Sequence, residues 1–293
     1  MNIKLSTPVL IRDKIVRKIK SNDKIIGVGS CFSEVMLNKL FSYGFEGMIN
    51  PNGIVYNAVS IAKSFRRLEE NLLYTKEEIF EYNKLWHSWE HHGSFSKLNL
   101  SETINAINAN FNQFREMLIK ANCIILTFSS SVIYELTESH NIVANCHKVP
   151  GNKFEKKLLT SRQNLESLRI IYSSIKKLNS NAMIIFTLSP VRHYPGNLQL
   201  NSVSKANLLS AITEFIDSIN DSNCFYFPAF EILMDELRDY RFYKNDMLHP
   251  SELAEELIFN RFTEAFMTSD CREKIKESCN RLKRLKHKTF VKE

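Results

Sequence analysis

The sequence predicts an α/β protein with a parallel sheet and helices on both of its faces. Short apolar runs alternate along the chain with longer segments of helical periodicity, which is the order that a parallel sheet requires. Glycine and proline are scarce, at 8 and 7 of 293 residues, so we expect long helices joined by short connections. A hydrophobic content of 44% is enough to bury a sizeable core.

Five short apolar runs have the length and composition of buried strands. They are residues 24–29, 45–50, 123–128, 182–188 and 224–227. Six segments have helical periodicity: 34–42, 56–70, 103–120, 154–177, 204–220 and 251–267. Ligands of such sheets collect where strands end and helices begin, so we expect functional residues in the loops that follow these strands.

The chain shows no internal repeat and no low-complexity linker. We expect one catalytic domain over residues 1–266, with residues 72–101 as an insert that covers the carboxyl edge of the sheet. Residues 267–293 form a basic tail, because residues 272–293 carry a net charge of +6 out of +7 for the whole chain. We interpret this tail as a solvated helix, with contact to an anionic membrane as the weaker alternative, and we expect no nucleic-acid partner.

The cysteines and the N-terminus bear on the compartment. Six cysteines occur without CxxC pairs, so we expect free thiols rather than a disulfide framework. No apolar run approaches the roughly 20 residues of a membrane span, and the first residues lack the apolar core of a secretory signal. These features predict a cytoplasmic protein.

Two potential nucleophiles, Ser30 and Cys31, lie at a strand-to-helix turn in the string GSCFS. A helix N-terminus offers free N–H groups to an oxyanion and favours a thiolate. The alternative is an N-cap serine beside a cysteine that fills the core. Near the other end, Asp246 and His249 are three residues apart, so a turn can let the carboxylate orient the imidazole. An early nucleophile followed by a late Asp-x-x-His is the order expected of a nucleophile–base pair. His249 on its own fits a capping or packing residue slightly better.

Six segments in this order resemble the GSCFA-domain family. They are GSCFS (29–33), NPNGIVYN (50–57), WHSWEHHGSFS (86–96), VANCHKVP (143–150), SPVRH (189–193) and DELRDYRFYKNDMLHPSE (235–252). The resemblance runs from about residue 25 to residue 266. That family is grouped with the SGNH, or GDSL-like, hydrolases. The resemblance therefore implies a flavodoxin-like three-layer α/β/α fold and an esterase or acyltransferase site, and it supplies no substrate.

The resemblance also implies roles for individual residues. Asp246 and His249 match the late Asp-x-x-His, and Gly53 matches the glycine whose backbone N–H helps to hold the oxyanion. The usual Gly-Asp-Ser places Cys31 at the nucleophile position, whereas the match of residue type names Ser30. We favour Cys31, since a helix N-terminus would lower the pKa of its thiol.

One motif of the SGNH hydrolases is missing. The Gly-x-Asn-Asp that normally donates an oxyanion asparagine is replaced by TFSSSVIY. We expect the third donor to be a serine hydroxyl, from Ser129 or Ser130, or the side chain of Asn145.

Other polar residues indicate a function less specifically. His87 and His91 have the i, i+4 spacing of zinc ligands, but the tryptophans around them favour an aromatic lid or substrate contacts, and we expect no metal. His147 and His193 lie near strand ends and are candidate substrate contacts or buried structural histidines. Arg192 could hold an anionic group or form an ion pair with 235–239.

The sequence thus predicts an SGNH-like esterase that forms a covalent acyl-enzyme with an acyl ester, on a glycan or another small acylated substrate. Two alternatives stay open: an O-acyltransferase that uses a thioester donor such as a coenzyme A thioester, and a glycan-binding module that has lost turnover. We expect no other cofactor, and the oligomeric state is unknown.

Overall fold

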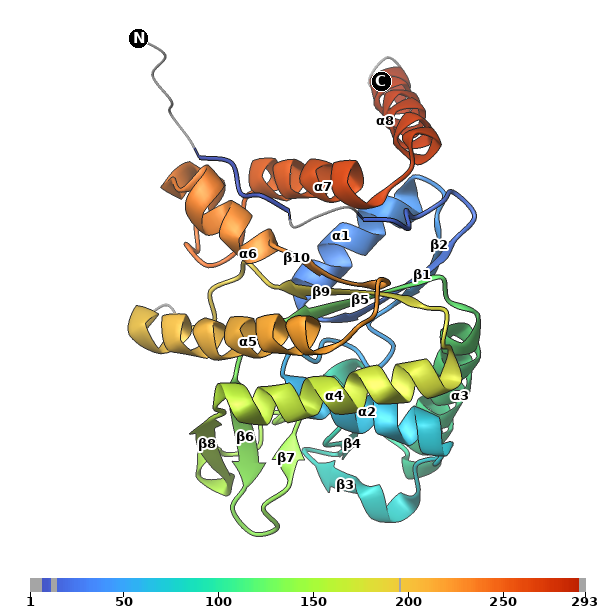
Figure 1. Cartoon of the computed structure of the whole chain (residues 1–293). Helices are drawn as coiled ribbons and strands as arrows, with labels where there is room; N and C mark the ends of the chain where they lie inside the picture. The colour runs from blue at the N-terminus through green and yellow to red at the C-terminus, as the bar shows by residue number, and fades with distance from the viewer. Residues whose placement is uncertain (1–6, 12–14, 195, 290–293) are drawn as a thin grey trace.

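A five-stranded parallel sheet forms the centre of the protein (Figure 1). The computed structural model describes residues 7–11, 15–194 and 196–289. Its strands are β1 (Lys24–Gly29), β2 (Glu46–Ile49), β5 (Cys123–Phe128), β9 (Met183–Leu188) and β10 (Cys224–Phe227). They lie in the order β10-β9-β5-β1-β2, and every neighbouring pair is parallel. This is the 2-1-3-4-5 order of flavodoxin-like folds, so the predicted fold class is confirmed.

Helices cover both faces of the sheet (Figure 1). One face packs against α1 (Cys31–Ser42) and α7 (Glu252–Phe266), the other against α2 (Ala58–Glu70), α3 (Leu100–Lys120), α4 (Ser161–Leu178) and α5 (Leu198–Ser218). Successive residues of a strand point to opposite faces, so Ile25 joins the core beside α1 and Ile26 joins the core beneath α2. Helix α5 begins six residues before the predicted start at 204.

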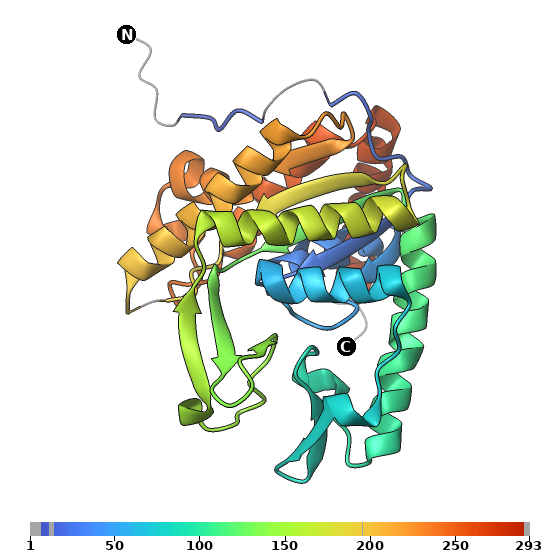
Figure 2. The ribbon, with the colours of Figure 1, turned by 60° about the horizontal axis from the view of Figure 1, so that its bottom comes forward.

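Two excursions project from the side of the sheet that α2 and α4 cover (Figure 2). The first is the insert, whose strands β3 (Ile79–Tyr82) and β4 (Leu85–Ser88) form an antiparallel hairpin between the short helices η1 (Lys76–Glu78) and η2 (Gly93–Phe95). The second contains an antiparallel sheet of order β7-β6-β8, from β6 (Val132–Leu136), β7 (Ile142–Val143) and β8 (Phe154–Leu158), with η3 (Gly151–Lys153) before β8.

The prediction of a helix from residue 154 is wrong over its first part. Residues Phe154–Leu158 pair with β6 instead, and α4 begins only at Ser161. Thr160 and Gln163 form a reciprocal capping box there, which satisfies backbone groups at the start of the helix.

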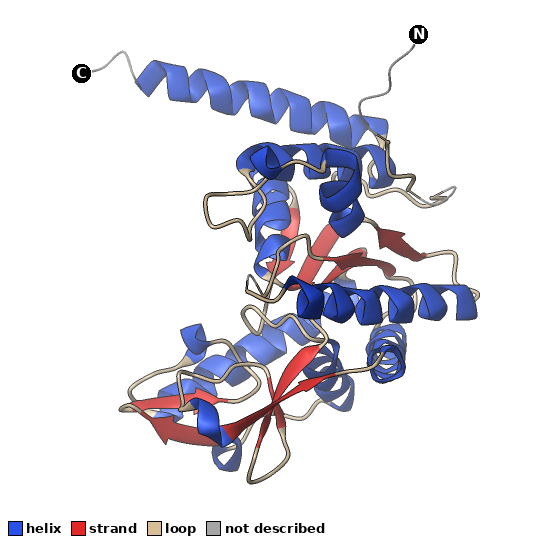
Figure 3. Cartoon of the chain, turned by 90° about the vertical axis from the view of Figure 1, so that its left-hand side faces the viewer, coloured by secondary structure: helices blue, strands red, loops and turns tan. Residues whose placement is uncertain are grey.

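The last described element is a long helix that extends from the body (Figure 3). Before it come α6 (Ala229–Glu231), a π-helical turn η4 (Ile232–Leu237) and η5 (Tyr240–Phe242). The last helix, α8 (Ser269–Thr289), is anchored near its start, where the Cys271 thiol donates to the Ile19 carbonyl over 3.3 Å. The last four residues of the predicted tail, 290–293, lie outside the described residues. No helix in the described part is long and apolar enough to cross a membrane.

Candidate active site

Ser30 and Cys31 follow β1 at the carboxyl edge of the sheet, and they differ in solvent exposure. Ser30 is the N-cap of α1, the residue is 1% exposed, and its Oγ has no hydrogen-bond partner. Cys31 is the first residue of the helix and is half-buried. The Cys31 sulfur lies against the backbone N–H groups of Cys31 and Phe32. Of the two candidates, Cys31 therefore presents the more accessible reactive atom.

The environment of Cys31 corrects one expectation. Burial raises the pKa of the thiol, and the negative charge of Glu34 raises it further. The two backbone N–H groups and the positive charge of Lys205 act in the opposite direction without overcoming these effects. The predicted lowering of the thiol pKa is therefore wrong, and ionisation of Cys31 requires a base.

The turn before Cys31 is fixed by Asn50, which follows β2. The Asn50 Oδ1 atom accepts a hydrogen bond from the Gly29 backbone N–H over 2.8 Å, and its Nδ2 donates to Glu34 over 3.1 Å. The Ser30 N–H donates to the Thr127 carbonyl over 3.1 Å. Sequence reasoning assigned no role to Asn50, although it opens the motif NPNGIVYN.

Asp246 and His249 form a hydrogen-bonded pair. Their Oδ2 and Nδ1 atoms are 2.7 Å apart, and the other carboxylate oxygen accepts from the backbone N–H groups of Leu248 and His249. These two amides and the imidazole lower the pKa of Asp246 to about 2. A carboxylate at Nδ1 holds the proton there and leaves Nε2 free to accept one.

The loop after β9 joins this turn to the edge of the sheet. The Arg192 N–H donates to the Leu248 carbonyl over 3.1 Å. His193 lies close enough to His249 for their charges to interact, and its ring centroid is 4.8 Å from that of Tyr56. Burial lowers the pKa of His193 to about 4, so the ring is neutral at pH 7, and its buried Nε2 has no hydrogen-bond partner.

Comparison with known proteins identifies the family of the chain. The model of the GSCFA family matches residues 24–262. The chain belongs to the GSCFA family. No curated protein matches the sequence of this GSCFA chain.

Three solved structures are distantly similar to the GSCFA chain. A carbohydrate esterase family 3 protein from Talaromyces cellulolyticus has 7% identity and a TM-score of 0.40, covering 87% of this chain and 99% of that one. An acetyl xylan esterase from Butyrivibrio proteoclasticus has 8% identity and a TM-score of 0.42, covering 84% and 64%. The periplasmic domain of a lipopolysaccharide acetyltransferase from Salmonella Paratyphi A has 11% identity and a TM-score of 0.40, covering 84% of each chain.

Gly53 in the GSCFA chain does not offer its amide to a substrate. Its N–H already donates to the Asn50 carbonyl over 2.7 Å. Its φ is +73°, and a Cβ at this position would lie 2.2 Å from the Cβ of His92. The expectation that this amide holds an oxyanion gains no support from this position and stays a prediction. Glycine is needed here because the insert approaches the turn so closely.

The three candidates for the third oxyanion donor have different surroundings. Ser130 has its Oγ 3.2 Å from that of Ser204 and accepts from the Val132 N–H over 2.9 Å, so it closes a turn. The Asn145 Oδ1 accepts from the His147 N–H over 2.8 Å, and Asn145 borders a cavity of about 370 Å³ that Tyr56 also lines. Ser129 follows β5 directly, and its Oγ accepts from the ammonium of Lys205 over 3.4 Å.

His87, His91 and His147 gather in the two excursions, where they make structural hydrogen bonds. His87 lies 2.6 Å from the Ser96 Oγ and 3.0 Å from the Tyr82 carbonyl oxygen. His91 lies 2.9 Å from the Ser88 Oγ, and His147 lies 2.8 Å from the Ser88 carbonyl oxygen. Their predicted role as substrate contacts gains no support from these positions. No group of three His, Cys, Asp or Glu side chains in the described residues could hold a metal ion.

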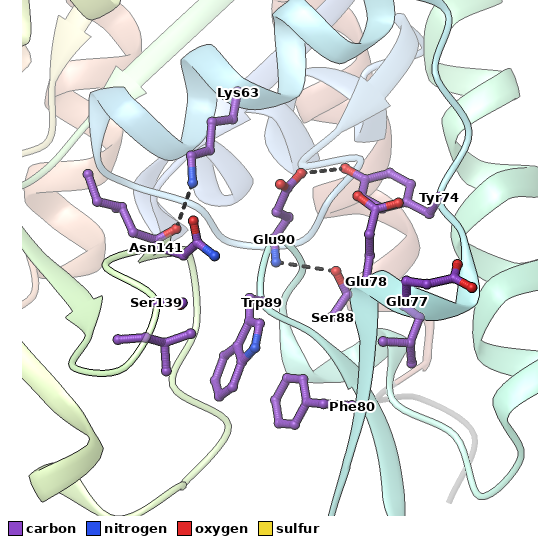
Figure 4. Close-up of a pocket in the computed structure, with 13 residues that line it drawn as sticks. Lys63, Tyr74, Glu77, Glu78, Phe80, Ser88, Trp89, Glu90, Ser139 and Asn141 are labelled. Carbon is purple, nitrogen blue, oxygen red and sulfur yellow. Dashed lines mark hydrogen bonds between the residues drawn. The ribbon is translucent and has the colours of Figure 1, made fainter.

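The insert encloses a cavity of about 330 Å³ with the loop between β6 and β7 (Figure 4). Phe80 and Trp89 stack there with ring centroids 3.7 Å apart. The Lys63 ammonium donates to the Ile142 carbonyl over 3.0 Å, and Tyr74 donates to Glu90 over 2.9 Å. The insert reaches the edge of the sheet at Gly53, through His92.

Arg192 lies beside aromatic rings. Its guanidinium is 4.2 Å from the ring centroid of Tyr243 and 5.9 Å from that of Tyr240. Together with Asp235 it borders a third cavity, of about 290 Å³. This guanidinium could bind either an anionic group or an aromatic ring.

The buried histidines predict a loss of stability in mild acid. Burial lowers the pKa of His91 to about 3 and that of His147 to about 4, against an ordinary value of 6.5. The unfolded chain therefore binds more protons than the folded one, and stability falls as the pH drops from 6.5 toward 3. For His91 we expect a loss of about 1–2 kcal/mol between pH 7 and pH 5.

Urea unfolding at several pH values measures this loss. We expect His91→Gln to show a flatter dependence on pH than the wild type, and His140→Gln, which changes an exposed histidine, to follow the wild type. Equal dependence in all three proteins would contradict the prediction.

Proposed function

We propose that this protein is an SGNH-type esterase in which Cys31 attacks the carbonyl carbon of an acyl ester. The observation that carries the proposal is the Asp246–His249 pair, held at 2.7 Å in a turn that is hydrogen-bonded to the loop after β9. Cys31 opens α1 at the carboxyl edge of the same sheet. A nucleophile, a base and a residue that orients the base are thus supplied by two separate segments.

The reaction then has two halves. His249 Nε2 takes the proton of the thiol as the Cys31 sulfur bonds to the carbonyl carbon, and the backbone N–H groups of Cys31 and Phe32 stabilise the oxyanion. The bond from carbon to the alcohol oxygen breaks, and the leaving alcohol takes the proton from His249. In the second half, His249 removes a proton from water as the water oxygen attacks the carbonyl carbon of the thioester. The bond from carbon to sulfur then breaks, the acid is released, and the Cys31 sulfur takes the proton from His249 and becomes a thiol again. The raised pKa of the thiol makes this base essential.

The acceptor of the acyl group decides which of two activities the protein has. Water as acceptor gives an esterase, whereas a hydroxyl group of a sugar gives an O-acyltransferase. A cysteine nucleophile suits a thioester donor, because exchange between a thiol and a thioester is nearly isoenergetic. We propose a glycan or a small acylated molecule as substrate, since polar and aromatic side chains border the cavity next to Tyr56 and Asn145.

The mass of the intact protein after brief exposure to p-nitrophenyl acetate tests the proposal. We expect one acetyl adduct on the wild type and on Ser30→Ala, and none on Cys31→Ala. Cys146→Ala is the matched control, since Cys146 is also a half-buried free thiol. An adduct that is lost in Ser30→Ala and kept in Cys31→Ala would make Ser30 the nucleophile. No adduct on the wild type would contradict the enzyme and favour a binding module.

A further inference from the structure

Lys205 is a lysine buried within the protein, on the face of α5 that packs toward the sheet. Its exposed fraction is 2%. The ammonium donates to the Ser189 carbonyl over 2.6 Å and to the Ser129 Oγ over 3.4 Å, and it lies 5.6 Å from the ring centroid of Phe230. Burial of an ammonium is costly unless it is paired, so a lysine at this position requires a reason.

The strand register places this ammonium close to the nucleophile turn. Ser129 and Ser189 directly follow β5 and β9, and the Ser189 N–H donates to the Phe128 carbonyl over 2.7 Å. On the other side of β5, the Ser30 N–H donates to the Thr127 carbonyl. Neighbouring strands are about 4.8 Å apart, so Lys205 lies about one strand from the turn that carries Cys31. In agreement, the charges of Lys205 and Cys31 influence each other's pKa.

Other charged and titratable groups also interact with Lys205. Glu231 of α6 interacts with its charge and accepts from the Tyr226 hydroxyl, over 2.9 Å at each carboxylate oxygen. His193, from the loop after β9, also interacts with Lys205. Burial lowers the pKa of Lys205 to about 7, and the anionic forms of Cys31 and Glu231 oppose that shift. An anion that forms at Cys31 therefore favours the protonated lysine.

We propose that Lys205 is a positioning residue whose ammonium stabilises negative charge at Cys31. This inference rests on the proposed function, in which Cys31 becomes anionic as it attacks. It assigns a source of positive charge to an edge of the sheet where the sequence lacks the Gly-x-Asn-Asp motif. The positive charge of Lys205 acts electrostatically on the Cys31 sulfur. The hydrogen bonds of the ammonium to Ser129 and Ser189 hold the lysine in place.

Alkylation of Cys31 by two reagents of different charge tests the inference. Iodoacetate is anionic and iodoacetamide is neutral, so the ratio of their rates reports the local potential, with Cys146 in the same molecule as reference. Lys205→Met keeps most of the side-chain volume and removes the charge. We expect it to lower the iodoacetate-to-iodoacetamide ratio at Cys31 by about tenfold and to raise the pH midpoint of alkylation by about one unit.

Lys63→Met is the matched control, because Lys63 also donates to a carbonyl oxygen but belongs to the cavity beside the insert. It should leave both quantities at Cys31 unchanged. A purely structural role of Lys205 would lower the melting temperature of Lys205→Met and leave the ratio and the midpoint as in the wild type, which would overturn the inference.

Two further outcomes are informative. If Lys205→Met does not fold, the wild type alone decides: the ratio at Cys31 must exceed that at Cys146, and equal ratios would overturn the inference. A shifted ratio without any acetyl adduct would keep the role of Lys205 and refute the esterase. An adduct that forms equally fast in Lys205→Met would refute this role and leave the esterase intact.

Discussion

His249→Ala is expected to slow acylation of Cys31 by p-nitrophenyl acetate by about 100-fold or more, the usual contribution of a positioned base. The effect should be large because the thiol has a raised pKa and does not ionise unaided. Burst kinetics of p-nitrophenol release measure the acylation rate directly. Raising the pH should partly restore the rate in the variant, since hydroxide then ionises the thiol in place of the missing imidazole.

A second histidine–carboxylate pair provides the control. His140 and Glu135 lie 3.0 Å apart in the second excursion, and the His140 side chain is more exposed than that of His249. His140→Ala should therefore retain the wild-type acylation rate. Equal rates in His249→Ala and the wild type would remove His249 from the mechanism and leave Cys31 without a base.

Gly29→Ala is expected to destabilise the fold by about 2 kcal/mol or more. Gly29 has a φ of +143°, which residues with a side chain rarely adopt, and an added Cβ would lie 2.1 Å from the Thr127 carbonyl oxygen. That contact is with backbone of the neighbouring strand, which cannot move aside without breaking the sheet. Urea unfolding followed by circular dichroism measures the change.

Gly151→Ala is the matched control, because nothing lies within 4 Å of a Cβ added there. It should change the free energy of unfolding by about 0.5 kcal/mol or less. If Gly29→Ala were as stable as this control, the close approach between β1 and β5 at the nucleophile turn would be wrong.

The sequence predicted the central sheet well because its strands are buried on both faces. Such strands are continuous apolar runs, and all five were found within two residues of their observed bounds. The strand at Phe154–Leu158 was missed because FEKKL is short, exposed and charged, and it becomes a strand only by pairing with β6. A pairing between segments about 20 residues apart leaves no local pattern in the sequence.

The candidate site was predictable where its residues are close together in the sequence. Asp246 and His249 are three residues apart, so their spacing alone suggested the hydrogen bond. The free amide expected at Gly53 was lost to Asn50 in a turn that no spacing reveals. Lys205 was missed because a lysine normally implies an exposed face; its signal was the position three residues before the buried Leu208 on the same side of α5.

The shared contacts of Ser88 have a consequence for how the protein opens. The Ser88 side chain and carbonyl hold His91 and His147, and the Trp89 carbonyl accepts from the Ala144 N–H over 2.8 Å. The insert and the second excursion leave the sheet at different points of the chain, yet neither can detach without exposing unpaired polar groups of the other. We therefore expect them to open as one cooperative unit, so that their amides exchange with solvent in a single event separate from that of the central sheet.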